Sequence, residues 1–217
     1  MDIILKEITK SFGQNKVLCG VNFHLRTGEI HALMGENGAG KSTLMNILYG
    51  LYHPTSGKIF IDGKETAIGT PQRAIDLGIG MVHQHFMLIP PFTVTENIAL
   101  GMEDTKGLVL DLKKSREKIV ELSKKYGLAV DPDAKIEDIS VGMQQRVEIL
   151  KVLYRGADIL ILDEPTRNLS PFSSVEIRKL LKSYKGSIIS VSHDKKYINE
   201  VCDKVYRLNK NGLELVI

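Results

Sequence analysis

Residues 35–42 read GENGAGKS and fit the pattern G-x-x-x-x-G-K-[ST]. Loops of this pattern wrap a polyphosphate in backbone N–H groups, bring the Lys to the β/γ-phosphates and offer the Ser hydroxyl to Mg²⁺. The flanking residues predict a short buried strand at 29–34 and a helix at 42–48, which would place the phosphates at a helix N-terminus. The alternative is a glycine-rich turn of no chemical use, but the strand–loop–helix context favours a phosphate site.

The bulk composition is that of an ordinary globular protein. The chain has 217 residues, of which 43% are hydrophobic and 25% charged, enough for one domain or a domain with an inserted lobe. The net charge of +3 is weak and the Lys and Arg residues are dispersed, so no direct contact with nucleic acid is predicted. Cys19 and Cys202 form no C-x-x-C pair and are interpreted as reduced core residues of a cytosolic protein.

No apolar run approaches the roughly 20 residues of a membrane span, and no secretory signal opens the chain. We therefore expect a soluble protein, which a partner would bring to a membrane.

The pattern of apolar residues changes twice along the chain. It predicts strands first, then helices between residues 92 and 155, then strands again, and this order favours a parallel core sheet with a helical insertion. The expected strands are residues 1–8, 17–25, 58–63, 78–84, 158–162 and 186–191, with a turn at 10–13. Three helices are expected in the middle of the chain. One starts near residue 95, and the other two cover residues 112–126 and 140–153.

Two adjacent carboxylates, Asp163 and Glu164, follow the buried strand at 158–162. Alone they would be interpreted as a polar turn. An enzyme with a phosphate-binding loop, however, needs one carboxylate near Mg²⁺ and one group that orients the attacking water. With the loop at 35–42 present, we assign these two tasks to Asp163 and Glu164 respectively.

Residues 139–146, ISVGMQQR, resemble the signature LSGGQQQR of ATP-binding cassette (ABC) ATPases, although Val141 and Met143 depart from it. The resemblance covers essentially the whole chain. It implies an α/β P-loop NTPase cassette with a mostly parallel core sheet, flanking helices, an N-terminal antiparallel β-subdomain and an inserted α-helical subdomain. Within a single domain of residues 1–217, residues 1–86 and 156–217 would form the core with the β-subdomain, and 87–155 the helical subdomain.

The resemblance also implies roles for individual residues, with ATP and Mg²⁺ as ligands. Catalysis would fall to Glu164, His193 and Gln84, and the metal shell to Ser42, Gln84 and Asp163. The signature residues Ser140, Gly142 and Met143 would meet ATP on an opposite cassette in a two-ATP sandwich. Nucleotide binding is expected from Phe12, which would stack on adenine, and from Gly35, Asn37, Gly38, Ala39, Gly40, Lys41, Ser42, Thr43, Ser140, Gly142 and Met143.

The two parts of the chain resemble different branches of the family. Residues 1–166 resemble the first cassette of bacterial nucleoside or simple-sugar importers, whereas 167–217 are more similar to ABC-F ATPases, which act on ribosomes. A hybrid chain joined near residue 166 is one hypothesis, and a natural cassette with an unusual D-loop is the other. In that loop, Ser170 stands where the family has Asp, and we expect this change to impair cooperative hydrolysis more than ATP binding.

Three functions follow as alternatives. The favoured one is an importer ATPase that is peripheral to the inner face of the cell membrane. Its partners would be a second cassette, in a homodimer or a tandem, and a transmembrane permease docked on the Gln84 segment and the helical lobe, at about residues 85–97. The others are an ABC-F-type ATPase and a cassette that binds ATP with little turnover. His83 and His85 suggest metal binding as well, but no partner cluster is evident to complete such a site.

Overall fold

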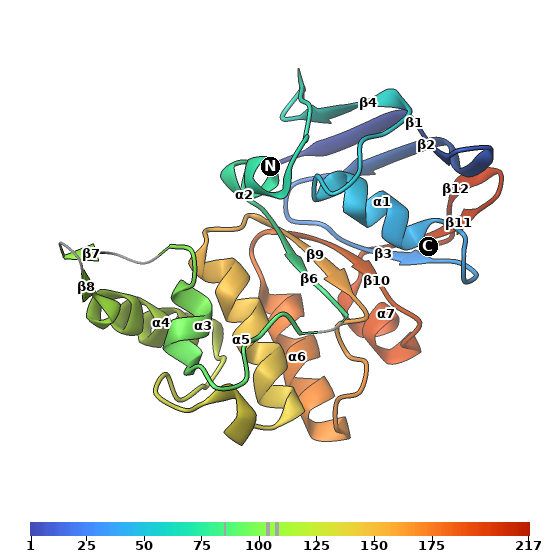
Figure 1. Cartoon of the computed structure of the whole chain (residues 1–217). Coiled ribbons are helices and arrows are strands. Elements are labelled where there is room, and N and C mark those ends of the chain that lie inside the picture. The colour runs from blue at the N-terminus through green and yellow to red at the C-terminus, as the bar shows by residue number, and fades with distance from the viewer. Residues whose placement is uncertain (85, 103–104, 107–108) are drawn as a thin grey trace.

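The computed structural model describes residues 1–84, 86–102, 105–106 and 109–217. Its centre is a sheet in the order β12-β11-β3-β10-β9-β6, in which β3, β6, β9, β10 and β11 run parallel and β12 is antiparallel. A second sheet, β2-β1-β4-β5, is antiparallel throughout. Figure 1 shows α1 between the two sheets and α3, α4, α5 and α6 on the far side of the core sheet.

The strands are β1 (Ile3–Phe12), β2 (Asn15–Leu25), β3 (Ile30–Met34), β4 (Ser56–Ile61), β5 (Lys64–Glu65), β6 (Ile79–Val82), β7 (Thr105–Lys106), β8 (Val109–Leu110), β9 (Ile159–Asp163), β10 (Ser187–Val191), β11 (Lys204–Asn209) and β12 (Gly212–Leu215). The helices are α1 (Lys41–Leu48), α2 (Pro71–Asp76), α3 (Val94–Ala99), α4 (Leu112–Tyr126), the 3₁₀ turn Ile136–Asp138, α5 (Val141–Tyr154), α6 (Pro171–Ser183) and α7 (Lys195–Val201). The α/β architecture with an antiparallel sheet and a helical insertion is confirmed.

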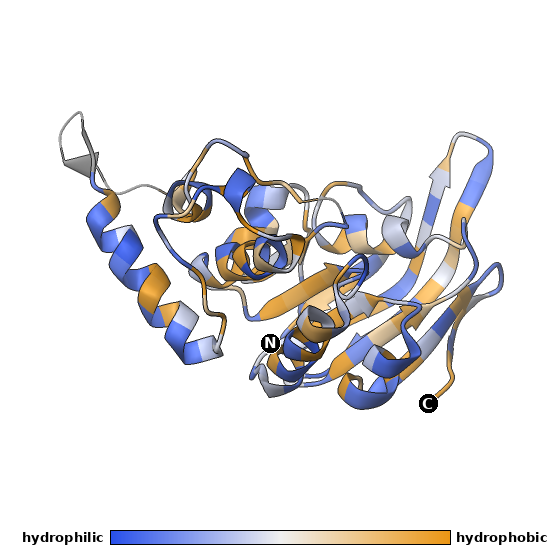
Figure 2. Cartoon of the chain, turned by 90° about the horizontal axis from the view of Figure 1, so that it is seen from below, coloured by the Kyte–Doolittle hydropathy of each residue, from blue (hydrophilic) through white to orange (hydrophobic). Residues whose placement is uncertain are grey.

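Alternation along the core strands builds two hydrophobic clusters. In β9, Ile159 and Ile161 pack with α1 and the antiparallel sheet, whereas Leu160 and Leu162 pack with the helices on the other face. Successive side chains of a strand point to opposite faces, so a strand covered on both faces must be apolar at every position. The central strands are accordingly mostly orange in Figure 2, whereas the peripheral helices and hairpins carry blue as well as orange.

Capping residues fix where the helices of the insertion begin and end. Thr93 and Glu96 form a reciprocal capping box at α3, Asp111 caps α4, and α4 stops at Gly127 in the left-handed conformation. The Ser140 hydroxyl accepts a hydrogen bond from Met143 N at the start of α5. No helix within the described residues is both long and apolar enough to cross a bilayer.

One expected turn is wrong. The turn predicted at residues 10–13 lies at 13–14 instead, because β1 continues to Phe12, which pairs with Asn15. Gly13 has a φ of 58°, and this left-handed conformation allows the two-residue turn of the hairpin. The strand expected at 78–84 is also shorter and ends at Val82.

An ionic cluster joins the start of β3 to β11. Lys204 Nζ donates to Glu29 Oε1 at 2.7 Å, and Nε2 of the fully buried His31 lies 2.8 Å from Glu29 Oε2. Burial raises the pKa of Glu29, but the hydrogen bonds from Lys204 and His31 outweigh it and lower the pKa from 4.5 to about 2. Glu29 is therefore a charged anchor between two strands that are distant in sequence.

We expect Glu29→Gln to weaken the dependence of the free energy of unfolding on pH between about pH 4.5 and pH 2. A carboxyl whose pKa is lower in the folded state stabilises it above pH 4.5 and loses this effect as the pH falls toward 2. The variant should be less stable than the parent at pH 7 by roughly 1–3 kcal/mol, with the gap closing toward pH 2. Urea unfolding at a series of pH values measures this gap, and a gap that is independent of pH would contradict the assignment.

Candidate nucleotide-binding site

The loop at 35–40 leads from β3 into α1 and is shaped by glycines. Gly38 and Gly40 have φ values of 82° and 97°, and a Cβ on Gly40 would lie 2.6 Å from Leu18 Cδ2. A Cβ on Gly35 would lie 2.4 Å from the backbone oxygen of Leu208. A larger residue at either position would therefore displace the loop.

The N-terminus of α1 opens into this loop. Its N-cap residue is Gly40, which has no side chain to cap the first N–H groups of the helix. Free N–H groups and the positive end of the helix dipole favour an anion at this position. This uncapped end is the feature of the structure that fits a polyphosphate.

The side chain of Lys41 is buried against the loop at 35–40. Its ammonium donates to the carbonyl oxygens of Gly35 at 2.7 Å and Glu36 at 3.0 Å, and only 8% of the residue is exposed. Burial lowers the pKa of Lys41, and the carboxylates of Glu164 and Asp163 oppose this shift. The ammonium is thus held at the loop where the sequence predicts a phosphate.

A cavity of about 460 Å³ unites most of the predicted residues. The ends of β3, β6, β9 and β10 meet there, because the carboxyl ends of parallel strands lie at one edge of a sheet. The predicted residues that line it are Asn37, Gly38, Gly40, Lys41, Ser42, Thr43, Gln84, Asp163, Glu164 and His193. Gly35 and Ala39 line an adjoining hollow, which His193 shares.

Glu164 is held in an unusual backbone conformation. Its φ is 50°, outside the regions that a glutamate ordinarily adopts, and its N–H donates to Val191 O at 2.9 Å. Its carboxylate accepts from His193 N at 3.3 Å and lies 3.8 Å from His193 Nε2. Strain of about 1–3 kcal/mol at such a residue is typical of functional positions.

The segment after Glu164 is tied to the strand end that carries His193. The Thr166 hydroxyl donates to Asp194 Oδ2 at 2.8 Å, and Asp194 also caps α7. Burial raises the pKa of Asp194, but the hydrogen bonds from Thr166 and from α7 prevail and lower it. Ser170, at the D-loop position, caps α6 by accepting from Ser173 N at 3.2 Å.

The oxygen-bearing groups in the cavity suit a hard cation. Mg²⁺ prefers oxygen ligands and usually keeps some waters while sharing substrate phosphates, so it needs few protein ligands. The Ser42 hydroxyl, the Gln84 amide and the Asp163 carboxylate supply such oxygens and lie in the same cavity as the uncapped helix end. Within the described ranges, no three His, Cys, Asp or Glu side chains group as a metal site. His85 lies outside those ranges.

Four predicted nucleotide contacts line neither this cavity nor the adjoining hollow. Ser140, Gly142 and Met143 lie at the start of α5, where contact with ATP would require a second cassette. Phe12 is 44% exposed and packs edge-on against Tyr52, with ring centroids 5.4 Å apart. Its stacking on adenine stays a prediction.

Four lining residues were not predicted from the sequence: Asn15, Val17, Arg167 and Val191, the last residue of β10. Asn15 and Val17 of β2 reach the cavity because β2 passes beside the loop, which no local pattern in the sequence indicates. Arg167 follows Glu164 by three residues and donates its N–H to Glu164 O at 3.0 Å. A cation so close in sequence to the predicted catalytic carboxylate was a usable signal, and it adds positive charge to the lining of the cavity.

Comparison with known proteins identifies the family. A family model described as "ABC transporter" matches residues 18–167, which include the loop, the signature and the two carboxylates. The chain belongs to this family. Its fold is that of a nucleotide-free ATP-binding cassette from an ABC transporter, with a TM-score of 0.86 at 23% identity over 98% of this chain and 90% of that one.

A second solved cassette, the bacterial ABC transporter cassette MJ0796 in a dimeric structure, aligns with a TM-score of 0.80 and 29% identity over 98% of this chain and 96% of that one. Among curated relatives, the nucleoside import ATP-binding protein NupA of Lactococcus lactis subsp. cremoris is 57% identical over 92% of this cassette. The guanosine import ATP-binding protein NupO of Bacillus subtilis is 51% identical over 96%. The chain spans about two fifths of the length of these relatives, 40% and 41%.

Proposed function

We propose that this cassette binds and hydrolyses MgATP as the energy-coupling subunit of an ABC importer for nucleosides or simple sugars. One observation carries the proposal: the phosphate loop, the carboxylates and His193 converge in one cavity at the edge of the core sheet. The 57% and 51% identity to nucleoside and guanosine import proteins supports the solute class.

The geometry suits in-line attack of water on a γ-phosphate. Lys41 and the N–H groups of α1 would hold the phosphates, and Glu164 would orient the water and accept its proton. His193, which is hydrogen-bonded through its backbone to Glu164, would steady the γ-phosphate. Mg²⁺ held by Ser42, Gln84 and Asp163 would supply positive charge to the phosphate oxygens. Catalysis would come mainly from positioning and charge stabilisation.

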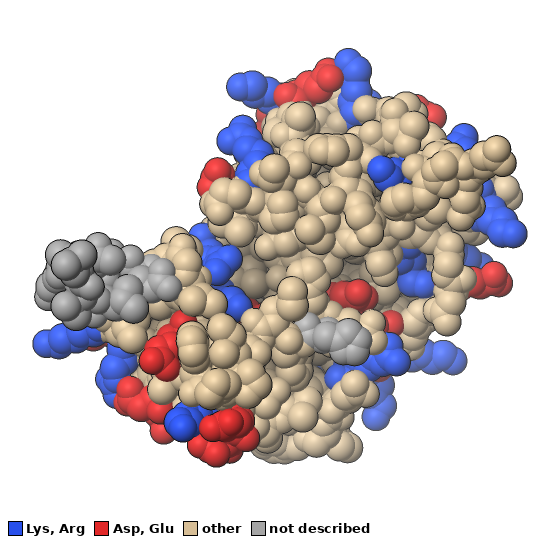
Figure 3. Space-filling view, viewed as in Figure 1, with Lys and Arg blue, Asp and Glu red and all other residues tan. Residues whose placement is uncertain are grey.

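We further propose the partners. A second cassette would bring its own signature residues to this cavity, while Ser140, Gly142 and Met143 of this cassette would serve the opposite site. A transmembrane permease would dock on the Gln84 segment and the helical lobe of residues 87–155, and the cassette would then lie at the cytoplasmic face of the membrane. Lys and Arg are interspersed with Asp and Glu over the face in Figure 3, an arrangement that does not favour a nucleic acid.

The experiment is MgATP hydrolysis per chain over a range of protein concentrations. Two chains that share ATP should give a specific activity that rises with concentration until dimers dominate. Activity that is absent at every concentration while ATP still binds would contradict hydrolysis by this chain with itself, and would point to a different partner cassette or to a D-loop that no longer couples.

A second candidate rests on the segment 167–171, RNLSP, in which Ser170 replaces the expected Asp. It is a hybrid or ABC-F-like cassette with ATP binding but little turnover. A single natural gene that encodes the whole continuous sequence would exclude the hybrid. Stimulation of turnover by ribosomes, but not by permease-containing vesicles, would favour the ABC-F alternative over the importer.

A further inference from the structure

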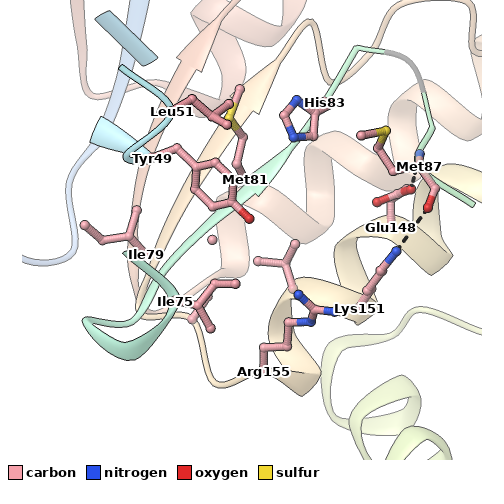
Figure 4. Close-up of a pocket in the computed structure, with 13 residues that line it drawn as sticks. Tyr49, Leu51, Ile75, Ile79, Met81, His83, Met87, Glu148, Lys151 and Arg155 are labelled. Atoms are coloured by element: carbon pink, nitrogen blue, oxygen red, sulfur yellow. Dashed lines mark hydrogen bonds between the residues drawn. The ribbon is translucent and has the colours of Figure 1, made fainter. Parts of the chain in front are cut away.

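A second cavity of about 320 Å³ lies between the core sheet and the helical lobe. Figure 4 shows Tyr49 and Met81 on one side of it, and Glu148 and Lys151 of α5 with Arg155, the residue that follows the helix, on the other. The core side is mostly apolar apart from His83, whereas α5 and its C-cap residue Arg155 contribute an acid and two bases. None of these residues belongs to the nucleotide site described above.

Two side chains of α5 form hydrogen bonds to the backbone of a single residue, Met87, at the rim of this cavity. We call this pair of bonds the grip on Met87. Met87 N donates to Glu148 Oε1 at 2.6 Å, and Lys151 Nζ donates to Met87 O at 3.1 Å, as the dashed lines in Figure 4 show. Glu148 and Lys151 are three residues apart and therefore share one face of the helix. Residues 86–89 belong to no helix or strand, so these bonds replace the ladder that regular structure would provide.

The carboxyl of Glu148 is buried, and burying a carboxyl costs free energy unless a partner compensates it. Only 4% of the residue is exposed, and its neighbours Val147 and Ile149 are core residues. Burial raises the pKa of Glu148, and the charge of Lys151 and the hydrogen bond from Met87 oppose the shift. A buried carboxyl is costly unless it is hydrogen-bonded, and Glu148 accepts a hydrogen bond from the backbone N–H of Met87.

Met87 and α5 each lie near a residue that is proposed to contact nucleotide. Met87 lies three residues after Gln84, which lines the nucleotide cavity. The same α5 begins at the signature, so Met143 and Lys151 are separated by only about 12 Å of rigid helix. A movement of α5 at its N-terminus would thus be transmitted to the chain that carries Gln84.

We infer that Glu148 and Lys151 are positioning residues that couple the two ATP sites of the sandwich. Their grip on Met87 sets the placement of Gln84 in its own cavity according to the position of α5, whose signature end meets the opposite nucleotide. The inference rests on the proposed function. It assigns the coupling to side chains outside both ATP sites.

The matched variants are Glu148→Ala and Glu148→Gln. Gln keeps the size and the acceptor oxygen for Met87 N–H, whereas Ala removes the acceptor. We expect Glu148→Ala to lower kcat about tenfold or more with KM for MgATP within about twofold, because small misplacement of a catalytic group is costly in rate. Glu148→Gln should keep most of the parental kcat. Where Glu148→Ala fails to fold, Lys151→Met, which keeps the aliphatic stem, should reproduce the loss in part.

A readout independent of turnover is hydrogen–deuterium exchange in the peptide that contains residues 86–89. MgATP should slow its exchange in the parent and in Glu148→Gln, but not in Glu148→Ala or Lys151→Met. Folded variants with parental kcat and a parental exchange response would overturn the inference, as would Glu148→Gln behaving like Glu148→Ala. A parent that binds ATP without hydrolysing it defeats the proposed function alone, since the exchange response still decides the coupling.

Discussion

Glu164→Gln should abolish turnover while ATP stays bound. Removing a group that acts only on the attacking water lowers the rate of the chemical step, for which a loss of roughly 10²–10³-fold in kcat is expected. The phosphate contacts proposed for Lys41 and α1 do not involve Glu164, so ATP affinity should be retained. Single-turnover phosphate release and retention of labelled ATP on the protein measure the two effects separately.

The hydrogen bonds around residue 164 can be kept when Gln replaces Glu. Gln keeps an oxygen that can accept from His193 N, and the backbone bond from Glu164 N to Val191 O does not involve the side chain. The same charge change at Glu121, on the exposed face of α4, should leave kcat at the parental value. A Glu164→Gln protein that hydrolyses ATP at more than about a tenth of the parental rate would refute the role of Glu164 as general base.

The sequence predicts the centre of this site well because its chemistry sits at strand ends. The loop at 35–42 and the pair Asp163 and Glu164 each follow a continuous apolar run, and such runs indicate strands buried on both faces. Parallel strands place their carboxyl ends at one edge, so two motifs more than 100 residues apart in the sequence meet. That convergence follows from topology rather than from local pattern.

Contacts that depend on the packing of distant segments were not predictable in the same way. Asn15 and Val17 line the cavity because β2 passes beside the loop. Similarly, β11 pairs with β3 although most of the sequence lies between them. The grip on Met87 links residues 61 positions apart that no periodicity connects. Some missed elements did carry local signals: Thr70 before Pro71 is the start of a capped helix, α2.

Lys41→Met should separate ATP binding from folding. Met keeps the length of the side chain but cannot contact phosphate, and hydrogen bonds between charged groups contribute about 1.5–3 kcal/mol, so affinity for ATP should fall about 10–100-fold. Equilibrium titration with a fluorescent ATP analogue measures this loss. Lys179→Met, on the exposed face of α6, removes the same charge far from the loop and should bind as the parent does.

The same substitution should leave stability nearly unchanged, and this contrast is the sharper part of the prediction. Lys41 is almost fully buried and its pKa is lowered by that burial, so the folded protein bears a desolvation cost for keeping the charge. Met removes that cost and in exchange forfeits two bonds to loop carbonyls. A large loss of Tm together with parental ATP affinity would show instead that Lys41 serves the loop and not the phosphates.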